Sequence, residues 1–565
     1  MTCTCLDEWS RPQAPLRESR SSSCGGHVNS RLFGVGAVLS VLAVVGGLAV
    51  PASSAPTSWP AGALPLGPAG LTETRTTQQL QPGVTLTRIV RGADAPALAW
   101  TVEVSIPGGA GSPDPDAPPS ALNDRASADD LVARLREHGF DARTEEVTAQ
   151  ATADFAGGTL GWRVRVGEFG SQSAATAERT RMRAAGYTGA AVYQGWDGEP
   201  TDRGPWRIDV LTIDPHRFHG ALRASYGPDL ENRETTSQLV AAAGATAGVN
   251  AGFFVLDPKA GAPGDPAGVG VYDGRLLSEP VSGRPSLVIH DSGTRTGIAR
   301  LTWQGKLSGR GVSLPLDGIN RVPGLIRNCG GTADDTPTSL PLHDATCTDD
   351  DELVAFTAEF GGRTPSGEGV EAVLDRHGRV LEVRSPRGGS LPEGGSSVQA
   401  TGRYVAQLGE LARTGRQLLI QAALKDVRGR TVSPSPSTSI LNGGPELVRD
   451  GRTHVTVATD GMVQPGNPSF YYGWVHKRNP RTLAGVDAAG RTVLVTADGR
   501  STGALGLSIP ESAAVAKALG LRDAMNLDGG GSTTMVAGGG VINAPSDATG
   551  ERPVGDALLV LPGRK

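Results

Sequence analysis

Apolar and polar residues alternate with a period of two along much of the chain, the pattern of half-buried β-strands. The clearest alternating runs are residues 84–90, 100–106, 206–214, 286–290 and 353–357. Gly and Pro cluster between them, as expected for turns. Helical spacing is confined to short stretches at 127–139, 173–185, 236–243, 404–412 and 511–519. The pattern predicts an α+β protein with a large mixed-sheet domain and few helices.

Residues 98–197 repeat one pattern twice. Each half has a strand with a tryptophan near its start, Trp100 or Trp162, followed by a helix and a second strand. Ser127 is the expected cap of the first helix. Two such halves predict a small four-stranded, ferredoxin-like βαββαβ sheet with both helices on one face.

The second half resembles the SPOR (sporulation-related repeat) domain in its Val-Gly-Glu-Phe turn at 166–169 and its Ala-Ala-Gly-Tyr helix exit at 184–187. Domains of this family bind peptidoglycan glycan strands, usually across the open face of the sheet. The resemblance therefore implies glycan contacts for Trp162, Arg163, Arg165 and Phe169. The alternative is a ferredoxin-like module that packs only against its neighbour, with these residues as core and rim.

The N-terminal region has the order of an export signal. Four arginines in residues 1–31 precede a charge-free apolar run at 32–50 and small residues up to Ala55. This order predicts a signal peptide in residues 1–55, although 19 apolar residues also suffice for an uncleaved anchor. Residues 56–79 are rich in Pro, Ala, Thr and Gln and predict a linker. We expect a secreted protein, or one associated with the cell wall or membrane.

Charge and cysteine content narrow the function classes. The net charge is −5 with a pI near 6.0 and no long basic run, so no nucleic-acid partner is expected. Beyond the apolar run only Cys329 and Cys347 occur, which predicts one disulfide in an oxidising compartment. The histidines show no metal-ligand spacing, and the acidic run at 349–352 predicts a solvated loop rather than a calcium site. No metal or cofactor is expected.

The stretch richest in candidate chemistry is residues 524–536. Asn526 and Asp528 precede three glycines and a hydroxyl-rich strand. Successive amides in such a turn can form a concave nest for an anion. The alternative is an ordinary hairpin turn, since Gly is a common turn residue.

Six motifs in order resemble the phosphodiester glycosidase (uncovering-enzyme-like) family. They are Asn-Ala-Gly-Phe-Phe at 250–254, Asn-Gly-Gly-Pro at 442–445, Pro-Arg-Thr at 480–482, Asp-Gly-Arg at 498–500, Asn-Leu-Asp-Gly-Gly-Gly-Ser at 526–532 and Glu-Arg-Pro-Val at 551–554. The resemblance covers residues 201–565 and a first strand within 80–97, so the SPOR-like module at 98–197 is an insertion. It implies cleavage of a sugar–phosphate diester at the anomeric carbon.

This chemistry needs a carboxylate near the anomeric carbon and groups that hold a phosphate and sugar hydroxyls. The expected catalytic residues are Asp528, Glu511 and Asn526, because glycosidases usually use a carboxylate pair. Arg481 suits phosphate because its planar fork matches the phosphate oxygens. The full expected substrate-binding set is Arg481, Thr482, Asn250, Asn442, Gly529, Gly530, Ser532 and Arg552.

Alternative roles are open for two of these residues and for the whole chain. Ser508 and Glu511 have the spacing of a helix capping box, which would make Glu511 structural. Arg481 could be a buried partner of Asp528 or Glu511. The chain could also be a non-catalytic peptidoglycan-binding protein on the same scaffold, or transfer the sugar to an acceptor other than water.

Overall fold

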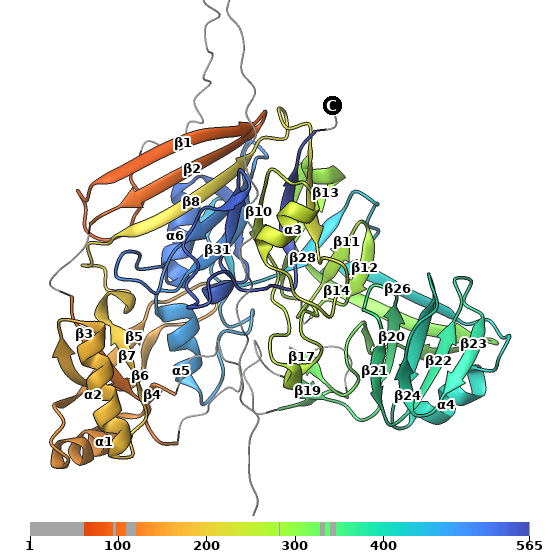
Figure 1. Cartoon of the computed structure of the whole chain (residues 1–565), viewed down its shortest axis with the longest axis horizontal. Coiled ribbons are helices and arrows are strands. Elements are labelled where there is room, and N and C mark those ends of the chain that lie inside the picture. Colours follow the sequence, from red (N-terminus) through yellow and green to blue (C-terminus); the bar gives the residue numbers. More distant parts are fainter. Residues whose placement is uncertain are drawn as a thin grey trace, which may run out of the picture. The chain divides into compact units, whose positions relative to one another are not determined.

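The structure is a computed structural model that describes residues 62–93, 98–108, 120–281, 283–327, 334–338 and 346–563. Strands dominate it, and helices lie on the faces or at the edges of several sheets (Figure 1). The predicted fold class, α+β with a large mixed-sheet domain and a small ferredoxin-like module, is confirmed.

An eight-stranded antiparallel sheet carries much of the candidate site. Its order is β1-β2-β8-β32-β31-β33-β29-β30, and helix α6 (Ile509–Ala518) packs against β29, β31 and β33. Every residue of β31 and β32 is buried, as expected for strands covered on both faces. The strands are β1 (Glu73–Gln81), β2 (Val84–Arg91), β8 (Trp206–Ile213), β29 (Glu446–Arg449), β30 (Arg452–Thr453), β31 (Arg481–Asp487), β32 (Thr492–Ala497) and β33 (Leu521–Asn526).

A second, five-stranded antiparallel sheet meets the first at the candidate site. Its order is β35-β34-β10-β36-β9, and α3 (Thr236–Ala242) packs on β10, β34 and β36. The strands are β9 (Ala221–Ser225), β10 (Ala247–Asn250), β34 (Met535–Ala537), β35 (Gly540–Val541) and β36 (Ala557–Leu561). The ends of β10 and β33 are joined by a backbone hydrogen bond from the Asp528 amide to the Ala251 carbonyl, at 2.9 Å.

The middle of the chain forms further sheets. A third sheet has the order β12-β11-β28-β13-β14-β26-β27, with β15 paired to β14, and a fourth has the order β16-β20-β25-β22-β23. The third comprises β11 (Gly270–Tyr272), β12 (Arg275–Ser278), β13 (Pro285–His290), β14 (Arg295–Gly309), β15 (Val312–Pro315), β26 (Leu419–Asp426), β27 (Thr431–Val432) and β28 (Ser439–Asn442). The fourth comprises β16 (Gly318–Ile319), β20 (Leu353–Thr357), β22 (Val370–Leu374), β23 (Val380–Arg384) and β25 (Ser396–Ala400), with helix α4 (Tyr404–Leu411) against it. Smaller ladders join β17 (Ile326–Arg327), β18 (Thr336–Pro337) and β19 (Thr346–Thr348), and β21 (Thr364–Gly367) with β24 (Arg387–Gly389).

The duplicated segment forms one sheet whose long strands run in the order β5-β6-β3-β7, as the βαββαβ pattern predicts. A short extra strand, β4, also pairs with β6. Helices α1 and α2 contact the strands through Leu131, Leu135 and Met182, which are buried. The elements are β3 (Trp100–Val104), β4 (Leu122–Asn123), α1 (Arg125–Glu137), β5 (Ala142–Ala149), β6 (Gly158–Phe169), α2 (Gln172–Ala184) and β7 (Gly189–Tyr193).

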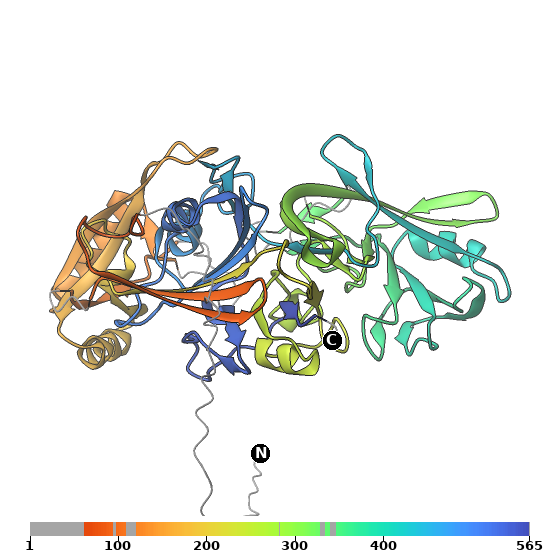
Figure 2. The same ribbon diagram turned by 90° about the horizontal axis from the view of Figure 1, so that it is seen from above.

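Two local predictions are wrong, and one helix was not predicted. The linker expected at 56–79 contains β1 from Glu73 onward, whose backbone pairs with β2 (Figures 1 and 2). Such an edge strand needs few apolar side chains, so its Thr- and Gln-rich sequence carries no hydrophobic signal. The cap of α1 is Asp124 rather than Ser127, because its carboxylate accepts the Ser127 amide. Helix α5 (Pro468–Tyr471), which continues into a π-turn at Tyr472–His476, was not expected.

Two expectations fall partly outside the described residues. Cys347 is fully buried in β19, but Cys329 is not described, so the disulfide stays a prediction. The apolar run at 32–50 is not described either. None of the helices that the structure describes has the length and hydropathy needed to span a bilayer.

We predict that Asp209 makes the stability of the large domain depend on pH. Its side chain is buried on β8, and burial, opposed by Arg88 and reinforced by Asp498, raises its pKa to about 7. The folded chain therefore keeps a proton that the unfolded chain releases near pH 4. The stability contribution is complete below about pH 4 and is lost as the pH rises through 7.

The Asp209→Asn substitution should remove this pH-dependent loss of folding stability. Urea unfolding at pH 5 and pH 8 should show that the wild type loses more stability over this interval than the variant, by about 1–3 kcal/mol. Equal losses would show that Asp209 is ionised in the folded state through its 3.4 Å ion pair with Arg88.

Candidate active site

The side chain of Asn250, at the end of β10, connects three segments of the site. Its Nδ2 donates to the Asp528 carbonyl at 2.7 Å, and its Oδ1 accepts from the Thr482 hydroxyl at 2.7 Å and the Thr534 amide at 3.1 Å. Asn250 and Thr482 are both fully buried. The structure thus places Asn250 beside Asp528 as a structural connector, and its expected hydrogen bond to the sugar or to an aligned water stays a prediction.

Asp528 begins the glycine turn and is only partly buried. One carboxylate oxygen accepts the Gly529 amide at 3.0 Å, and the Gly530 amide donates to the Pro480 carbonyl at 2.9 Å. Gly530 has a φ of 59°, a conformation that favours glycine. Because these two amides are bonded within the protein, the predicted phosphate contacts of the Gly529 and Gly530 amides are wrong.

Two guanidinium groups border this turn. A Cβ at Gly530 would lie 3.2 Å from Nη2 of Arg500, and a Cβ at Gly531 would overlap the guanidinium of Arg552. Only glycine permits this approach of the arginines to the backbone. Arg500, with a φ of 56°, belongs to the Asp-Gly-Arg motif but was not among the expected site residues. A non-glycine residue with a positive φ is uncommon and often marks a functional site.

Asp547 fixes the second of these arginines. Its carboxylate accepts from Nε and Nη2 of Arg552 at 2.7 and 3.0 Å, the two-point geometry that holds a guanidinium plane in place. Asp547 was also not expected from the sequence, although it lies five positions before Arg552. The carboxylate residue Asp528 and the guanidinium groups of Arg500 and Arg552 therefore border the same glycine turn.

Arg481 lies beside the turn, and its guanidinium group is bonded to backbone carbonyls. Its Nε donates to the Leu507 carbonyl at 2.9 Å and its Nη2 to the Trp474 carbonyl at 2.7 Å, and the residue is 2% exposed. Burial, with the nearby Arg500, lowers its pKa to about 9. The hydrogen-bond partners of Arg481 are carbonyl oxygens, so its guanidinium supports the backbone here, and its expected contact with phosphate stays a prediction.

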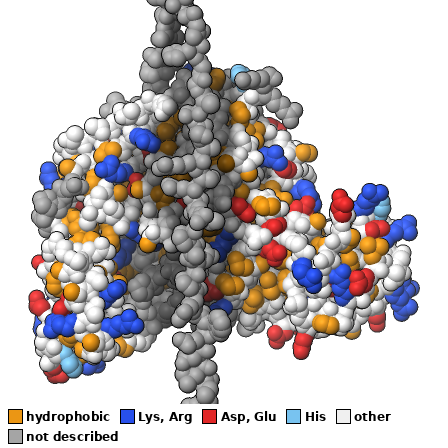
Figure 3. Space-filling model, in the orientation of Figure 1, with side chains coloured by type: hydrophobic (Ala, Val, Ile, Leu, Met, Phe, Trp, Pro, Cys, Tyr) orange, Lys and Arg blue, Asp and Glu red, His pale blue; other side chains and the backbone are white. Residues whose placement is uncertain are grey.

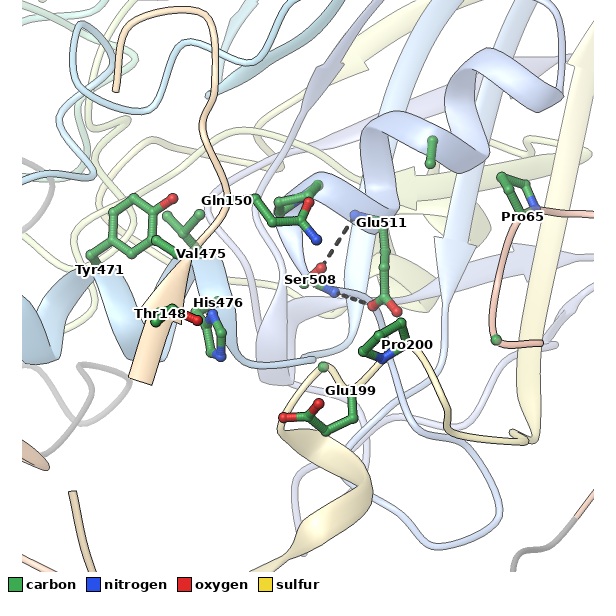
Figure 4. Close-up of a pocket in the computed structure, with 15 residues that line it drawn as sticks. Pro65, Thr148, Gln150, Glu199, Pro200, Tyr471, Val475, His476, Ser508 and Glu511 are labelled. Atoms are coloured by element: carbon green, nitrogen blue, oxygen red, sulfur yellow. Dashed lines mark hydrogen bonds between the residues drawn. The ribbon is translucent and has the colours of Figure 1, made fainter. Parts of the chain in front are cut away.

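Glu511 faces a different space. Its amide and carboxylate form the capping box with Ser508, and both carboxylate oxygens accept Nε of Arg478 at 3.0 Å. Glu511 lines a cavity of about 410 Å³ with Gln150, Glu199 and His476 (Figure 4). Asp528 does not line this cavity. The capping-box alternative is therefore confirmed, and the expected pairing of Asp528 and Glu511 at one centre stays a prediction.

The remaining expected residues are buried next to the turn, where Asn526 and Asn442 form hydrogen bonds to the backbone. Asn526 donates to the Gly444 and Leu527 carbonyls, at 3.0 and 2.6 Å, and Asn442 exchanges hydrogen bonds with the backbone of Phe253. Ser532 is 1% exposed. These buried positions fix the backbone around Asp528, so direct contact of Asn442, Asn526, Thr482 or Ser532 with a substrate is not supported.

Known proteins similar to this chain match the part of it that contains the candidate site. A family model described as phosphodiester glycosidase matches residues 368–561, which include the turn and both arginines. The mouse N-acetylglucosamine-1-phosphodiester α-N-acetylglucosaminidase is 32% identical over 117 residues, which are 20% of this chain and 22% of the mouse enzyme. Residues 368–561 therefore carry a phosphodiester glycosidase-like domain. A model of the SPOR domain matches residues 120–194.

The chain is also similar to solved structures. The crystal structure of a Burkholderia pseudomallei protein described as exported is 34% identical, with a TM-score of 0.79 over 89% of this chain and 99% of that chain. The zebrafish N-acetylglucosamine-1-phosphodiester α-N-acetylglucosaminidase catalytic domain is 13% identical, with a TM-score of 0.30 over 74% of this chain and 83% of that chain. The likeness to the Burkholderia structure thus covers most of this chain.

The open sheet face of the SPOR domain is covered by the glycosidase domain. On the face opposite the helices, Arg165 bonds to Glu103 at 2.9 Å and to Asp197, and Arg163 donates to the Tyr472 hydroxyl at 2.8 Å. The Tyr472 hydroxyl in turn donates to Glu103 at 2.8 Å. Burial alone would raise the pKa of Glu103, but Lys477, Arg165 and Arg163 outweigh it and hold that pKa well below its usual range.

This interface corrects the expected glycan contacts. Arg163 is 8% and Arg165 1% exposed, so neither reaches solvent in this arrangement. Trp162 and Phe169 are partly buried and pack against the hydrophobic core. The alternative in which these four residues are core and rim describes the structure.

Proposed function

We propose that the protein is an extracytoplasmic hydrolase that cleaves glycosyl-1-phosphodiester bonds in cell-wall or envelope polymers. The observation that carries this proposal is the turn at 528–531, where the Asp528 carboxylate and the guanidinium groups of Arg500 and Arg552 border the same few backbone atoms. The match of residues 368–561 to the phosphodiester glycosidase model supports the reaction class. The SPOR domain and the exported relative support the location outside the cytoplasm.

The geometry suits a reaction with a phosphate leaving group. Arginine forks bind phosphate oxygens, so Arg500 and Arg552 would hold the diester with its negative charge. Asp528 would stabilise positive charge that develops at the anomeric carbon, or activate the attacking water. The C1–O bond breaks, the phosphomonoester leaves with the bonding electrons, and water supplies the hydroxyl at C1 and releases a proton. A phosphomonoester is a good leaving group, so a second carboxylate as general acid is not required.

Hydrolysis in H₂¹⁸O of a synthetic N-acetylglucosamine-1-phosphodiester tests which bond breaks. Cleavage at the anomeric carbon puts ¹⁸O into the sugar and none into the phosphomonoester, as mass spectrometry and ³¹P NMR can show. Label in the phosphate would identify a phosphodiesterase instead and contradict the proposal. Absence of turnover on a panel of sugar-1-phosphodiesters would favour the non-catalytic alternative.

Asp528→Asn should lower kcat by at least about a hundredfold, because the charge facing the reacting carbon is lost. Asp450→Asn is the matched control, since Asp450 is an exposed carboxylate on the β29–β30 turn of the same domain. Its φ of 49° is tolerated by Asn. Equal activity of the wild type and Asp528→Asn would remove Asp528 from the mechanism.

The SPOR domain is the proposed contact with peptidoglycan glycan strands. Because its open face is covered by residues 469–477, binding there requires that glycan displaces this segment. On the face shown in Figure 3, the described Lys and Arg side chains are interspersed with Asp and Glu side chains.

Retention on purified peptidoglycan tests whether glycan competes with residues 469–477 for the open face of the SPOR domain. Tyr472→Phe removes the hydroxyl that bridges Arg163 and Glu103, so it should loosen the interface and raise retention about five- to tenfold over the wild type. Tyr187→Phe is the control, because its hydroxyl contacts the exposed His138 instead. Equal retention of all three proteins would contradict glycan binding at the covered face.

A further inference from the structure

Three aspartates from separate segments converge outside the candidate active site. Asp317 lies between β15 and β16, Asp349 follows β19, and Asp334 comes from the segment before β18. One carboxylate oxygen from each lies within 4.8 Å of the others. Carboxylates this close repel one another unless a proton or a cation intervenes.

Asp349 supplies the observation that points to a ligand. It is 8% exposed, and its Oδ1 accepts the Asp351 amide at 2.8 Å, whereas its Oδ2 is buried with no hydrogen-bond partner in the described chain. Burial without a partner is costly for a carboxylate oxygen. Burial raises the pKa of Asp349, and the charged groups that raise it further are Glu352, Asp334 and Asp335, all carboxylates.

The other two aspartates are held in place. Asp317 is 1% exposed, and its Oδ2 accepts the Leu353 amide at 2.6 Å, which fixes its carboxylate at the start of β20. Asp334 is exposed and forms an ion pair with Arg403, whose side chain is itself half exposed. The acidic run at 349–352 is therefore not the solvated loop that the sequence predicts, since Asp349 and Glu352 are buried and Glu352 pairs with Arg321.

We propose that Asp317, Asp334 and Asp349 bind a calcium ion. All three donors are hard carboxylate oxygens, which favour Ca²⁺ or Mg²⁺ over zinc. Two ligands of one Ca²⁺ at 2.3–2.6 Å lie up to about 5 Å apart, whereas ligands of Mg²⁺ at 2.0–2.1 Å lie within about 4.2 Å. Three carboxylate oxygens that lie within 4.8 Å of one another can therefore all reach one Ca²⁺.

The ion has a structural consequence that is independent of the proposed glycosidase activity. Asp317 immediately precedes β16, and Asp349 lies four residues before β20, the strand with which β16 forms a parallel pair. A shared ion would connect the segments that lead into these two strands. It would also anchor β19, which contains Cys347, to the fourth sheet.

Calcium titration of the full chain after removal of metal with EDTA tests the site. Calorimetry should show one Ca²⁺ per chain, and millimolar CaCl₂ should raise the Tm. Asp349→Asn should weaken binding at least about tenfold, because loss of even an outer partner of a metal ligand has that effect. Asp350→Asn is the matched control, since Asp350 is exposed and lies outside the trio.

Stability without metal separates loss of the site from failure to fold. Metal-free Asp349→Asn should melt at or above the metal-free wild type, because the substitution removes one of three repelling charges. No binding of Ca²⁺ by the wild type would overturn the proposal. Equal Ca²⁺ affinity of the wild type and Asp349→Asn would overturn it as well, as would tighter binding of Mg²⁺ than of Ca²⁺.

Discussion

The buried amide of Asn250 is the interaction on which the candidate active site depends. β10 and β31 belong to different sheets, and the Asn250 side chain links them through the Thr482 hydroxyl and the Asp528 carbonyl. A buried amide that loses its partners costs about 1–3 kcal/mol for each unsatisfied group. The hydrogen bonds of Asn250 therefore hold the two sheets in one relative position next to Asp528.

Close packing orders the glycine turn itself. The turn brings its backbone against the guanidinium groups of Arg500 and Arg552, and any side chain at Gly531 would overlap Arg552 and Asp547. Behind the turn, Arg481 connects the start of β31 to the carbonyls of Trp474 and Leu507. Positive charge thus serves two purposes here, since Arg481 supports the backbone while Arg500 and Arg552 border the glycine turn that follows Asp528.

The sequence predicted the fold class, the phosphodiester glycosidase-like domain and the turn at Asp528. Each of these rests on local patterns of residues, namely short motifs and the alternation of apolar and polar positions in strands. The capping box of Ser508 and Glu511 was also visible, since its partners lie three residues apart. The roles of Arg481, Arg163 and Arg165 were not predictable in this way. Arg163 contacts Tyr472, 309 positions away, and Arg481 bonds to backbone carbonyls that no side-chain motif reveals.

The most direct test of this account is a double-mutant cycle between Asn250→Ala and Thr482→Val, with unfolding free energies measured in urea. The 2.7 Å hydrogen bond between the two buried side chains predicts a coupling free energy of about 1–2 kcal/mol. The double variant should therefore be less destabilised than the sum of the single variants. Additive losses would contradict the claim that Asn250 holds the two sheets together at the Asp528 turn.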